Sequence, residues 1–309
     1  MSVYVYPTDR KWFRFLQDRS PLDEVNFWQP GGSTEFRALK PGDLFLFRLK
    51  SPINMIAGGG VFATSSLYPL SGAWDAFGEK NGVASFAALF DAINRYRAKN
   101  GSLPATADTQ IGCIVLTQPF FLSERDWLPT PPDYHLSLVQ GKRFGLDTET
   151  GARLHEWGIT HAAMQPIRRH AAEPTAPMFG DPVLIRPRLG QGAFRLVVSD
   201  AYAKRCAVTG EKTLPVLEAA HIKPVSRGGE HRVDNGLLLR SDLHKLFDLG
   251  YVTVTPEGNF RVSGKLKETW MNGRIYYDLD RTMVRRPSRE EQFPSRHLLE
   301  WHNDSIFRG

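Results

Sequence analysis

Three polar residues that could do chemistry fall within one short stretch of the chain. They are His221, Asn235 and His244, spaced by fourteen and nine residues. An imidazole can take a proton from water, and an imidazole beside other ligands can hold a metal ion. Hydrolysis of a phosphodiester bond uses both capacities at one site. The spacing therefore indicates a nuclease-like constellation.

The elements predicted around these residues would hold them in place. Residues 217–221 have the pattern of a hairpin strand that ends at His221, and residues 241–249 that of a short helix. On this helix His244 and Asp248 are four residues apart, which places both side chains on one face. The sequence thus predicts strand, loop and helix as the scaffold of the site.

The stretch from Cys206 to Gly250 resembles the HNH endonucleases, which have the ββα-metal fold, and in particular the branch that carries the string EAAHI…NGLLL…LHKLFD. The resemblance implies a role for each polar residue. His221 would be the general base that activates water, Asn235 the asparagine that fixes the loop, and His244 a ligand of a divalent cation at the scissile phosphate. The preceding string RLGQGAFR…AY…RCAVTG is typical of the same branch.

One position departs from the pattern of this family. Many members place an acidic metal ligand directly before the base, where this chain has Ala220. Glu218 shares a strand face with Ala220, because side chains two apart in a strand point to the same side, so its longer arm is one candidate ligand. Asp248 is the other candidate, and it could equally pair with Lys245. The sequence leaves both candidates open.

Several other histidines and cysteines have ordinary explanations. His231 and His297 are expected to be surface or core residues without a part in catalysis, as most single histidines are. Cys113 and Cys206 lie far apart and form no C-x-x-C pair, which argues against a disulfide framework and against a four-cysteine zinc site. Cys206 is expected to be a small core residue.

Length and composition limit the class of protein. A chain of 309 residues is long enough for two ordinary domains, each with its own core. No run approaches eighteen apolar residues, and the N-terminal residues MSVYVYPTDRKW lack the apolar stretch of a secretion signal. We therefore expect a cytoplasmic protein that has no membrane segment.

Positive charge is concentrated in the second half of the chain. The net charge is +6, and residues 1–160 carry 16 Lys and Arg against 16 Asp and Glu, whereas residues 161–309 carry 23 against 17. A cationic half favours a polyanion such as DNA, because each neutralised phosphate releases counterions. Any single basic side chain is more often a solvated surface charge, and the candidate DNA contacts are Arg188, Arg195, Arg205, Lys223 and Arg227.

A linker divides the chain into two expected domains. Residues 164–185 are rich in proline, alanine and charge and have no period of 2 or 3.6, which is typical of a linker. It would separate an N-terminal domain, residues 1–163, from the nuclease domain, residues 186–309. Within the latter, residues 270–309 are expected to add a small strand pair and a terminal helix.

The N-terminal domain is expected to be a small mixed β-barrel, so that the chain as a whole is α+β. Turn residues precede most of its apolar runs, and strands outnumber helices. The glycines at 58–60 lie within a strand and indicate a bulge or a close approach of another backbone. The predicted strands cover residues 3–6, 44–49, 55–62 and 111–116, and the predicted helices cover residues 10–19 and 85–98.

The string LKPGDLFLFRLKS…IAGGGVF, followed by AWDAFGEKNGV, resembles the PUA-like superfamily over roughly residues 1–160. This superfamily includes readers of methylated or otherwise modified nucleobases. Such readers flip a base out of the stack and hold it in an aromatic-lined pocket. Trp28, Trp74 and Phe77 are the candidate pocket walls because they lie next to loops, although core packing is the more frequent role of such residues.

A base-reading domain joined to an HNH nuclease is the architecture of a modification-dependent restriction endonuclease. We therefore expect an enzyme that flips a modified cytosine, such as 5-methylcytosine, and cuts double-stranded DNA nearby. Mg²⁺ or Mn²⁺ suits oxygen ligands, and a histidine ligand also tolerates Zn²⁺, Co²⁺ or Ni²⁺. One HNH domain resembles a cutter of single strands, so a double-strand break requires a homodimer or two encounters.

Two alternatives remain open at this point. The first is a defence nuclease whose N-terminal domain recognises unmodified DNA or another nucleic acid. The second, from another class, is a nucleic-acid-binding protein with a decayed catalytic centre, for which only Ala220 argues. Cleavage of methylated against unmethylated DNA tests the first alternative, and metal-dependent nicking of any DNA tests the second.

Overall fold

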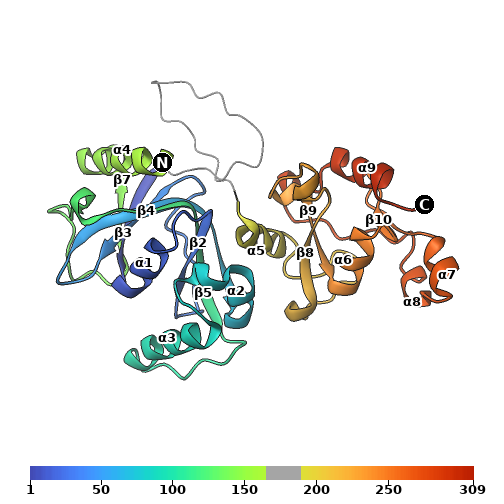
Figure 1. Cartoon of the computed structure of the whole chain (residues 1–309), viewed down its shortest axis with the longest axis horizontal. Helices are drawn as coiled ribbons and strands as arrows, with labels where there is room; N and C mark the ends of the chain where they lie inside the picture. Colours follow the sequence, from blue (N-terminus) through green and yellow to red (C-terminus); the bar gives the residue numbers. More distant parts are fainter. Residues whose placement is uncertain (165–188) are drawn as a thin grey trace. The chain divides into compact units, whose positions relative to one another are not determined.

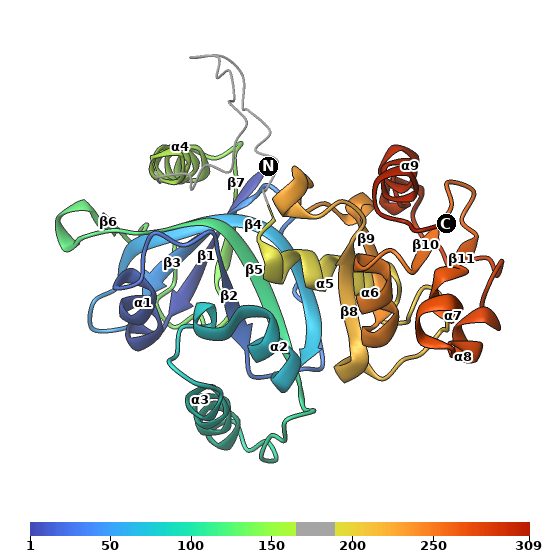
Figure 2. The same ribbon diagram turned by 45° about the vertical axis from the view of Figure 1, so that its right-hand side comes forward.

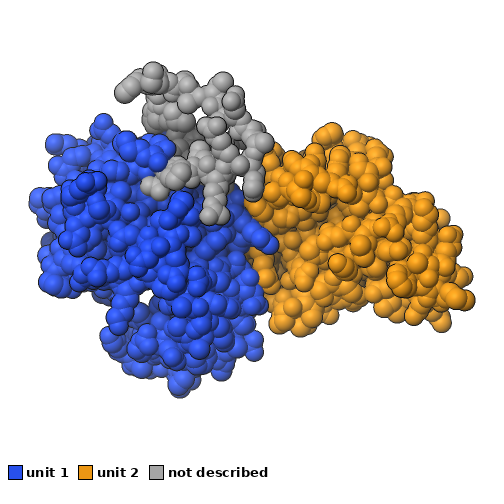
Figure 3. Space-filling model, in the orientation of Figure 1, with its two compact units in different colours: residues 1–193 blue, residues 194–309 orange. Residues whose placement is uncertain are grey.

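The computed structural model describes residues 1–164 and 189–309 of the chain. These residues form two compact units, Met1–Ala193 and Phe194–Gly309, which Figure 3 colours blue and orange. The predicted linker, apart from Met164, and the predicted start of the nuclease domain at residue 186 lie outside the described residues.

The first unit is built on one sheet of seven strands (Figure 1). The strand order is β2-β5-β4-β3-β1-β7, with β6 paired to β4. β1 and β3 run parallel, and the other pairs are antiparallel. The strands are β1 (Ser2–Thr8), β2 (Glu24–Gln29), β3 (Leu44–Leu49), β4 (Met55–Pro69), β5 (Gln110–Phe121), β6 (Leu128–Pro129) and β7 (Lys142–Gly145).

The prediction of a barrel is wrong, because the sheet is open. Among the described residues no pairing joins its end strands, β2 and β7. In β3 the side chains of Phe45 and Phe47 enter an aromatic core on one face, and those of Leu44 and Leu46 enter a second core on the other face. A continuous apolar run that is buried on both sides is typical of a sheet lying between helices.

Helices cover both faces of this sheet, as Figures 1 and 2 show for α1 and α4. Asp9 caps α1 by accepting a hydrogen bond from the amide of Lys11 at 2.8 Å, and the helix buries Trp12 and Phe13 in the aromatic core. From α4, Leu154 enters the second core. The helices of the unit are α1 (Arg10–Gln17), α2 (Leu70–Phe77), η1 (Gly78–Asn81), α3 (Phe86–Lys99), η2 (Glu124–Asp126) and α4 (Glu149–Ala163).

The predicted close approach at the glycines of β4 is confirmed. A Cβ on Gly58 would lie 2.2 Å from the carbonyl oxygen of Phe120, and a Cβ on Gly59 would lie 2.7 Å from that of Phe45. The pairing of β4 with both neighbours also shifts register in this region. Side chains at these positions would push the strands apart.

The second unit contains two small antiparallel ladders, β8 with β9 and β10 with β11. The predicted strand 217–221 is confirmed as β8 (Leu217–His221), and the predicted helix after residue 240 as α6 (Ser241–Asp248). The remaining elements, including the helix α5 that crosses the boundary between the units, are α5 (Gln191–Ala201), η3 (Leu214–Val216), η4 (Val225–Arg227), η5 (Val233–Asn235), β9 (Gly236–Arg240), β10 (Val252–Val254), β11 (Phe260–Val262), α7 (Lys265–Trp270), α8 (Arg274–Tyr277), η6 (Glu290–Gln292) and α9 (Arg296–Ser305).

One core joins these elements. It includes Phe194 and Val198 from α5, Leu237 from β9 and Phe247 from α6. Cys206 is fully buried in the same core, as expected, and no disulfide bond joins Cys113 and Cys206. Burial of each large apolar side chain contributes roughly 1.5–3 kcal/mol, so this packing is what holds the small ladders together.

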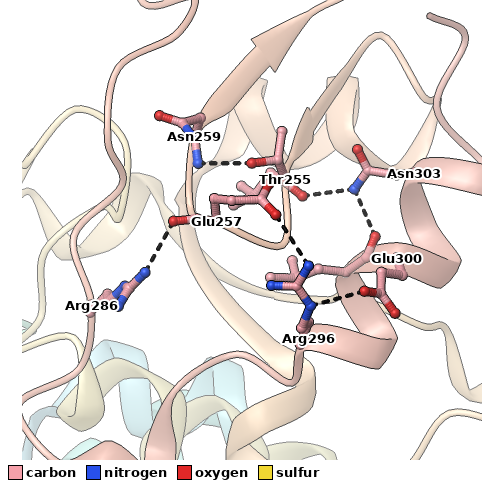
Figure 4. A network of polar contacts seen from close by, with 9 residues as sticks. Thr255, Glu257, Asn259, Arg286, Arg296, Glu300 and Asn303 are labelled. Atoms are coloured by element: carbon pink, nitrogen blue, oxygen red, sulfur yellow. Dashed lines mark hydrogen bonds and ion pairs between the residues drawn. The ribbon is translucent and has the colours of Figure 1, made fainter.

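The C-terminal part ties α9 to the turn between β10 and β11 (Figure 4). Arg296 donates to Glu257 at 3.3 Å and to Glu300 at 3.0 Å, and Asn303 donates to the carbonyl of Val254 at 2.8 Å. The strand pair predicted for residues 270–309 is wrong, because residues 274–277 form the helix α8 and this range, which is fully described, contains no strand. Within the described ranges no helix is long and apolar enough to cross a membrane.

Candidate active site

The first histidine of the site ends β8, in a hairpin whose register is set by β9. His221 pairs with Gly236. A Cβ on Gly236 would come 2.4 Å from Cγ2 of Val198 and 3.1 Å from the ring of Phe194. The missing side chain therefore lets α5 pack directly on the hairpin, and this places Phe194 next to His221.

The imidazole of His221 stacks on the ring of Phe194. The two ring centroids are 3.9 Å apart and the planes differ by 11°. Burial lowers the pKa of His221 to about 4, and the nearby His231 and His244 act in the same direction. The ring is therefore neutral at physiological pH, which is the state in which it can accept a proton.

A second histidine contacts His221 from the loop that follows. Nε2 of His221 lies 3.0 Å from Nδ1 of His231, a hydrogen bond in which one nitrogen donates and the other accepts. No other hydrogen bond to His221 is found within the described residues, so its Nδ1 has no protein partner there. The sequence did not predict His231 at this position, because a histidine outside the motif looks like a surface residue. Its position in the loop between His221 and Asn235 was the available signal.

Asn235 lies at the end of the loop that follows His221, and only 1% of the residue is exposed. Its Oδ1 accepts from the amide of Lys223 at 2.8 Å, and its Nδ2 donates to the carbonyls of Lys223 at 3.0 Å and Glu230 at 2.8 Å. Three of the four hydrogen bonds that an asparagine side chain can make are thus directed to the loop backbone. They hold together two segments that are seven residues apart.

His244 lies between two carboxylates. Its Nδ1 is 2.6 Å from Oε2 of Glu218 on β8, and its Nε2 is 3.5 Å from Oδ2 of Asp248, one turn further along α6. The structure therefore brings together all three predicted metal ligands. The partner of Asp248 is His244 rather than Lys245. Ala220 is fully buried in the core.

The donor types around His244 suit a divalent ion, but they do not form a complete cage. The two carboxylates contact opposite nitrogens of the ring, and the described residues contain no group of three or more His, Cys, Asp or Glu side chains arranged to hold a metal ion. Mg²⁺ is usually bound by one or two carboxylates together with substrate phosphates. The residues are of the kinds that such a site requires, and phosphate oxygens of a substrate would have to complete it.

A family model matches the segment that contains these residues. Residues 206–255 match HNH_2, described as HNH endonuclease. The chain carries an HNH endonuclease domain. It is therefore a nuclease, and HNH nucleases generally use divalent metal ions.

Comparisons with solved structures and with curated proteins do not extend the functional assignment. A solved structure titled "Modification dependent TagI restriction endonuclease" is similar at a TM-score of 0.30 and 12% sequence identity, over 98% of this chain and 81% of that chain. A likeness at this level carries no argument about fold or function. No curated protein matches the chain.

The basic residues predicted to contact DNA differ in their surroundings. In the HNH endonuclease domain Arg227 is exposed at the end of η4, and Lys223 lies two residues after His221 with its Nζ 5.4 Å from the ring centroid of Trp301. Arg205 is half-buried. Arg195 is also half-buried, and its Nε is buried without a partner in the described part of the chain. Arg188 lies outside the described residues.

The three residues predicted to line a base pocket have different surroundings in the first unit. The indole N–H of Trp28 donates to the carbonyl of Asn81 at 2.9 Å, and its ring packs edge-on against Tyr96. Trp74 and Phe77 lie on α2, and Phe77 is 3% exposed. Among the residues that the structure describes, no ring contact joins Trp28, Trp74 and Phe77.

Proposed function

We propose that this protein is a metal-dependent DNA endonuclease of restriction or defence type, which recognises modified cytosine through its N-terminal unit. The HNH endonuclease domain would hydrolyse the phosphodiester bond. The observation that carries the proposal is the arrangement of His221 and His244. One imidazole has a pKa lowered to about 4 and a nitrogen without a partner among the described residues, and the other lies between two carboxylates.

In this proposal His221 is the general base. Its Nδ1 takes a proton from water, and the water oxygen attacks phosphorus. The bond from phosphorus to the 3′ oxygen breaks, and this oxygen leaves with the electron pair and takes a proton from solvent water. Phe194 fixes the plane of the ring by stacking on it. Asn235 acts at a distance from the reacting atoms, since its three hydrogen bonds shape the loop that follows the base.

The contacts of His244 indicate which carboxylate would hold the ion. A carboxylate has no proton to donate, so in the neutral imidazole the 2.6 Å contact with Glu218 favours a proton on Nδ1 and a lone pair on Nε2. This lone pair and Oδ2 of Asp248, 3.5 Å away, are two acceptors that a cation between them would stabilise. We therefore assign His244 and Asp248 as ligands, and Glu218 as the group that orients the imidazole.

The ion that these ligands would hold is Mg²⁺ or Mn²⁺, given the oxygen ligands. When bound, it would offset negative charge on the phosphate and on the leaving oxygen. Water and phosphate oxygens of the DNA would fill the remaining coordination positions, because His244 and Asp248 are the two ligands proposed among the described residues.

Recognition of modified cytosine is supported by the PUA-like sequence pattern of the first unit and by its aromatic side chains. The half-buried rings of Tyr4, Tyr6 and Phe36 lie on the α1 face of the sheet. Tyr4 packs edge-on against Phe36 with centroids 5.3 Å apart, and Tyr6 packs edge-on against the buried Phe27 at 5.0 Å. Aromatic faces of this kind can hold a base that has left the stack. We propose Tyr4 and Tyr6 for this role beside the predicted Trp28, Trp74 and Phe77.

Plasmid cleavage tests the proposal directly. Unmodified, 5-methylcytosine and 5-hydroxymethylcytosine DNA are incubated with the enzyme and Mg²⁺ or Mn²⁺, with His221→Ala as the control. We expect cutting of modified DNA only, and none by the variant. Equal cutting of all substrates would support the nuclease activity but would contradict the recognition of modified cytosine. No cutting with any metal would favour a binding protein with a decayed centre.

A further inference from the structure

We infer that His231 is a positioning residue for catalysis, which holds His221 in the tautomer that can accept a proton from water. The inference rests on the proposed role of His221 as the general base. It concerns a residue outside the family motif, and the hydrogen bond between Nε2 of His221 and Nδ1 of His231, 3.0 Å long, carries it.

Only one direction of this hydrogen bond is compatible with a base. A neutral imidazole carries a proton on one nitrogen and a lone pair on the other. If His231 donated, Nε2 of His221 would be the acceptor, its proton would sit on Nδ1, and no lone pair would face the substrate. If His221 donates from Nε2, its Nδ1 keeps the lone pair. His231 must therefore be the acceptor, with its own proton on Nε2.

The hydrogen bond between His221 and His231 also stabilises His221 after it has accepted a proton. Once water has given a proton to Nδ1 of His221, the imidazolium has a proton on each nitrogen. The Nε2 proton points at the lone pair of His231, which stabilises the charge or takes the proton to its Nδ1. In the second case His221 is neutral again, and His231 carries the positive charge until it releases a proton to solvent.

Further contacts keep Nδ1 of His231 within hydrogen-bond distance of His221. Its ring lies against Phe194, with centroids 5.7 Å apart, and against His221, with centroids 5.0 Å apart. The residue directly before it, Glu230, gives its carbonyl to Nδ2 of Asn235. One aromatic ring thus supports both histidines, and one buried amide anchors the backbone that carries His231.

Variants of His231 distinguish its role as a hydrogen-bond acceptor from a role in packing alone. In His231→Asn the amide oxygen can take the place of Nδ1 and accept from His221, whereas His231→Phe keeps a ring without an acceptor. We expect His231→Phe to lower kcat roughly 10- to 100-fold with unchanged DNA binding and thermal stability, and His231→Asn to retain most of the activity. His297→Ala, an exposed histidine on α9, is the matched control.

A spectroscopic measurement decides the tautomer without any cleavage assay. In protein labelled with ¹⁵N-histidine, the ¹⁵N shifts of each ring show which nitrogen carries the proton. We expect His221 to be protonated at Nε2 in the wild-type protein and in His231→Asn, and to become a mixture of tautomers in His231→Phe. This readout stands even if the protein cuts none of the DNA substrates, so failure of the proposed function would be recognised separately.

Three results would overturn the inference. The first is a His221 protonated at Nδ1, which would make His231 the donor. The second is full activity of His231→Phe. The third is equal loss of activity in His231→Phe and His231→Asn, which would show that the acceptor is irrelevant.

Discussion

Phe194 and His221 lie face to face, with ring centroids 3.9 Å apart and planes that differ by 11°. Phe194 belongs to α5 and His221 to the end of β8, so the stack joins the helix that precedes the HNH match to the hairpin inside it. A parallel aromatic ring fixes the plane of the imidazole and shields one of its faces from water. This geometry fixes the orientation of the His221 imidazole.

Replacing Phe194 tests the stack. Phe194→Leu keeps much of the volume but offers no flat face, so we expect kcat to fall about tenfold while the free energy of unfolding drops by about 1–2 kcal/mol. Phe194→Tyr keeps the ring and should stay near the wild-type rate. Plasmid nicking and urea denaturation measure the two effects. Unchanged kcat in Phe194→Leu would show that the stack has no part in catalysis.

Asn235→Ala should loosen the loop between the base and β9. The substitution leaves the amide and carbonyl of Lys223 and the carbonyl of Glu230 without their partner, at a cost of about 2–3 kcal/mol. We expect faster hydrogen exchange at Lys223 and loss of cleavage. Asn235→Asp keeps the acceptor and loses both donors, so an intermediate exchange rate is expected. Asn272→Ala, at an exposed position, is the control. An unchanged exchange rate at Lys223 would show that the hydrogen bonds of Asn235 do not hold the loop.

The two carboxylates at His244 should respond differently to amide substitution. Asp248→Asn removes the proposed charged ligand, so we expect the Mn²⁺ concentration for half-maximal binding to rise at least about tenfold. Glu218→Gln still offers an oxygen to the ring N–H, and a smaller change is expected. Calorimetric titration of Mn²⁺ checks both, with the exposed Asp304→Asn as control. A larger loss of Mn²⁺ affinity in Glu218→Gln than in Asp248→Asn would identify Glu218 as the ligand.

His302 should make the fold sensitive to acid. Its ring is 2% exposed, stacks on Phe247 with centroids 3.7 Å apart, and hydrogen-bonds to Thr253 at 2.9 Å, and burial lowers its pKa to about 4. In the unfolded chain the ordinary pKa is near 6.5. The unfolded state therefore binds the proton first. The contribution to stability is full above pH 6.5 and is lost as the pH falls towards 4, by up to about 3 kcal/mol.

Urea denaturation between pH 7 and pH 4.5 measures this dependence. We expect His302→Gln to be less stable than the wild type at pH 7 but to lose less stability on acidification. The difference between the two curves isolates His302 from the other groups that titrate. Parallel curves would show that His302 is not the acid-sensitive group. His297→Ala should follow the wild-type curve.

Much of the candidate site could be predicted from the sequence. β8 and α6 follow from local apolar patterns, and the spacing of His221, Asn235 and His244, together with the resemblance of the surrounding residues to the HNH endonucleases, indicates a nuclease. These features depend on residues close together in the chain, and their steric and capping preferences act over a few positions. The HNH match to residues 206–255 confirms the nuclease.

Other features were decided by the tertiary structure alone. The stack of Phe194 on His221 and the contact of His244 with Glu218 join segments that are more than twenty residues apart. The contact of His231 with His221 depends on the path of the loop between them. The barrel was wrong for the same kind of reason: apolar content shows that β3 is buried, but only packing shows that it is buried on both faces. Such contacts depend on how whole elements pack against each other, and local sequence patterns do not encode that packing.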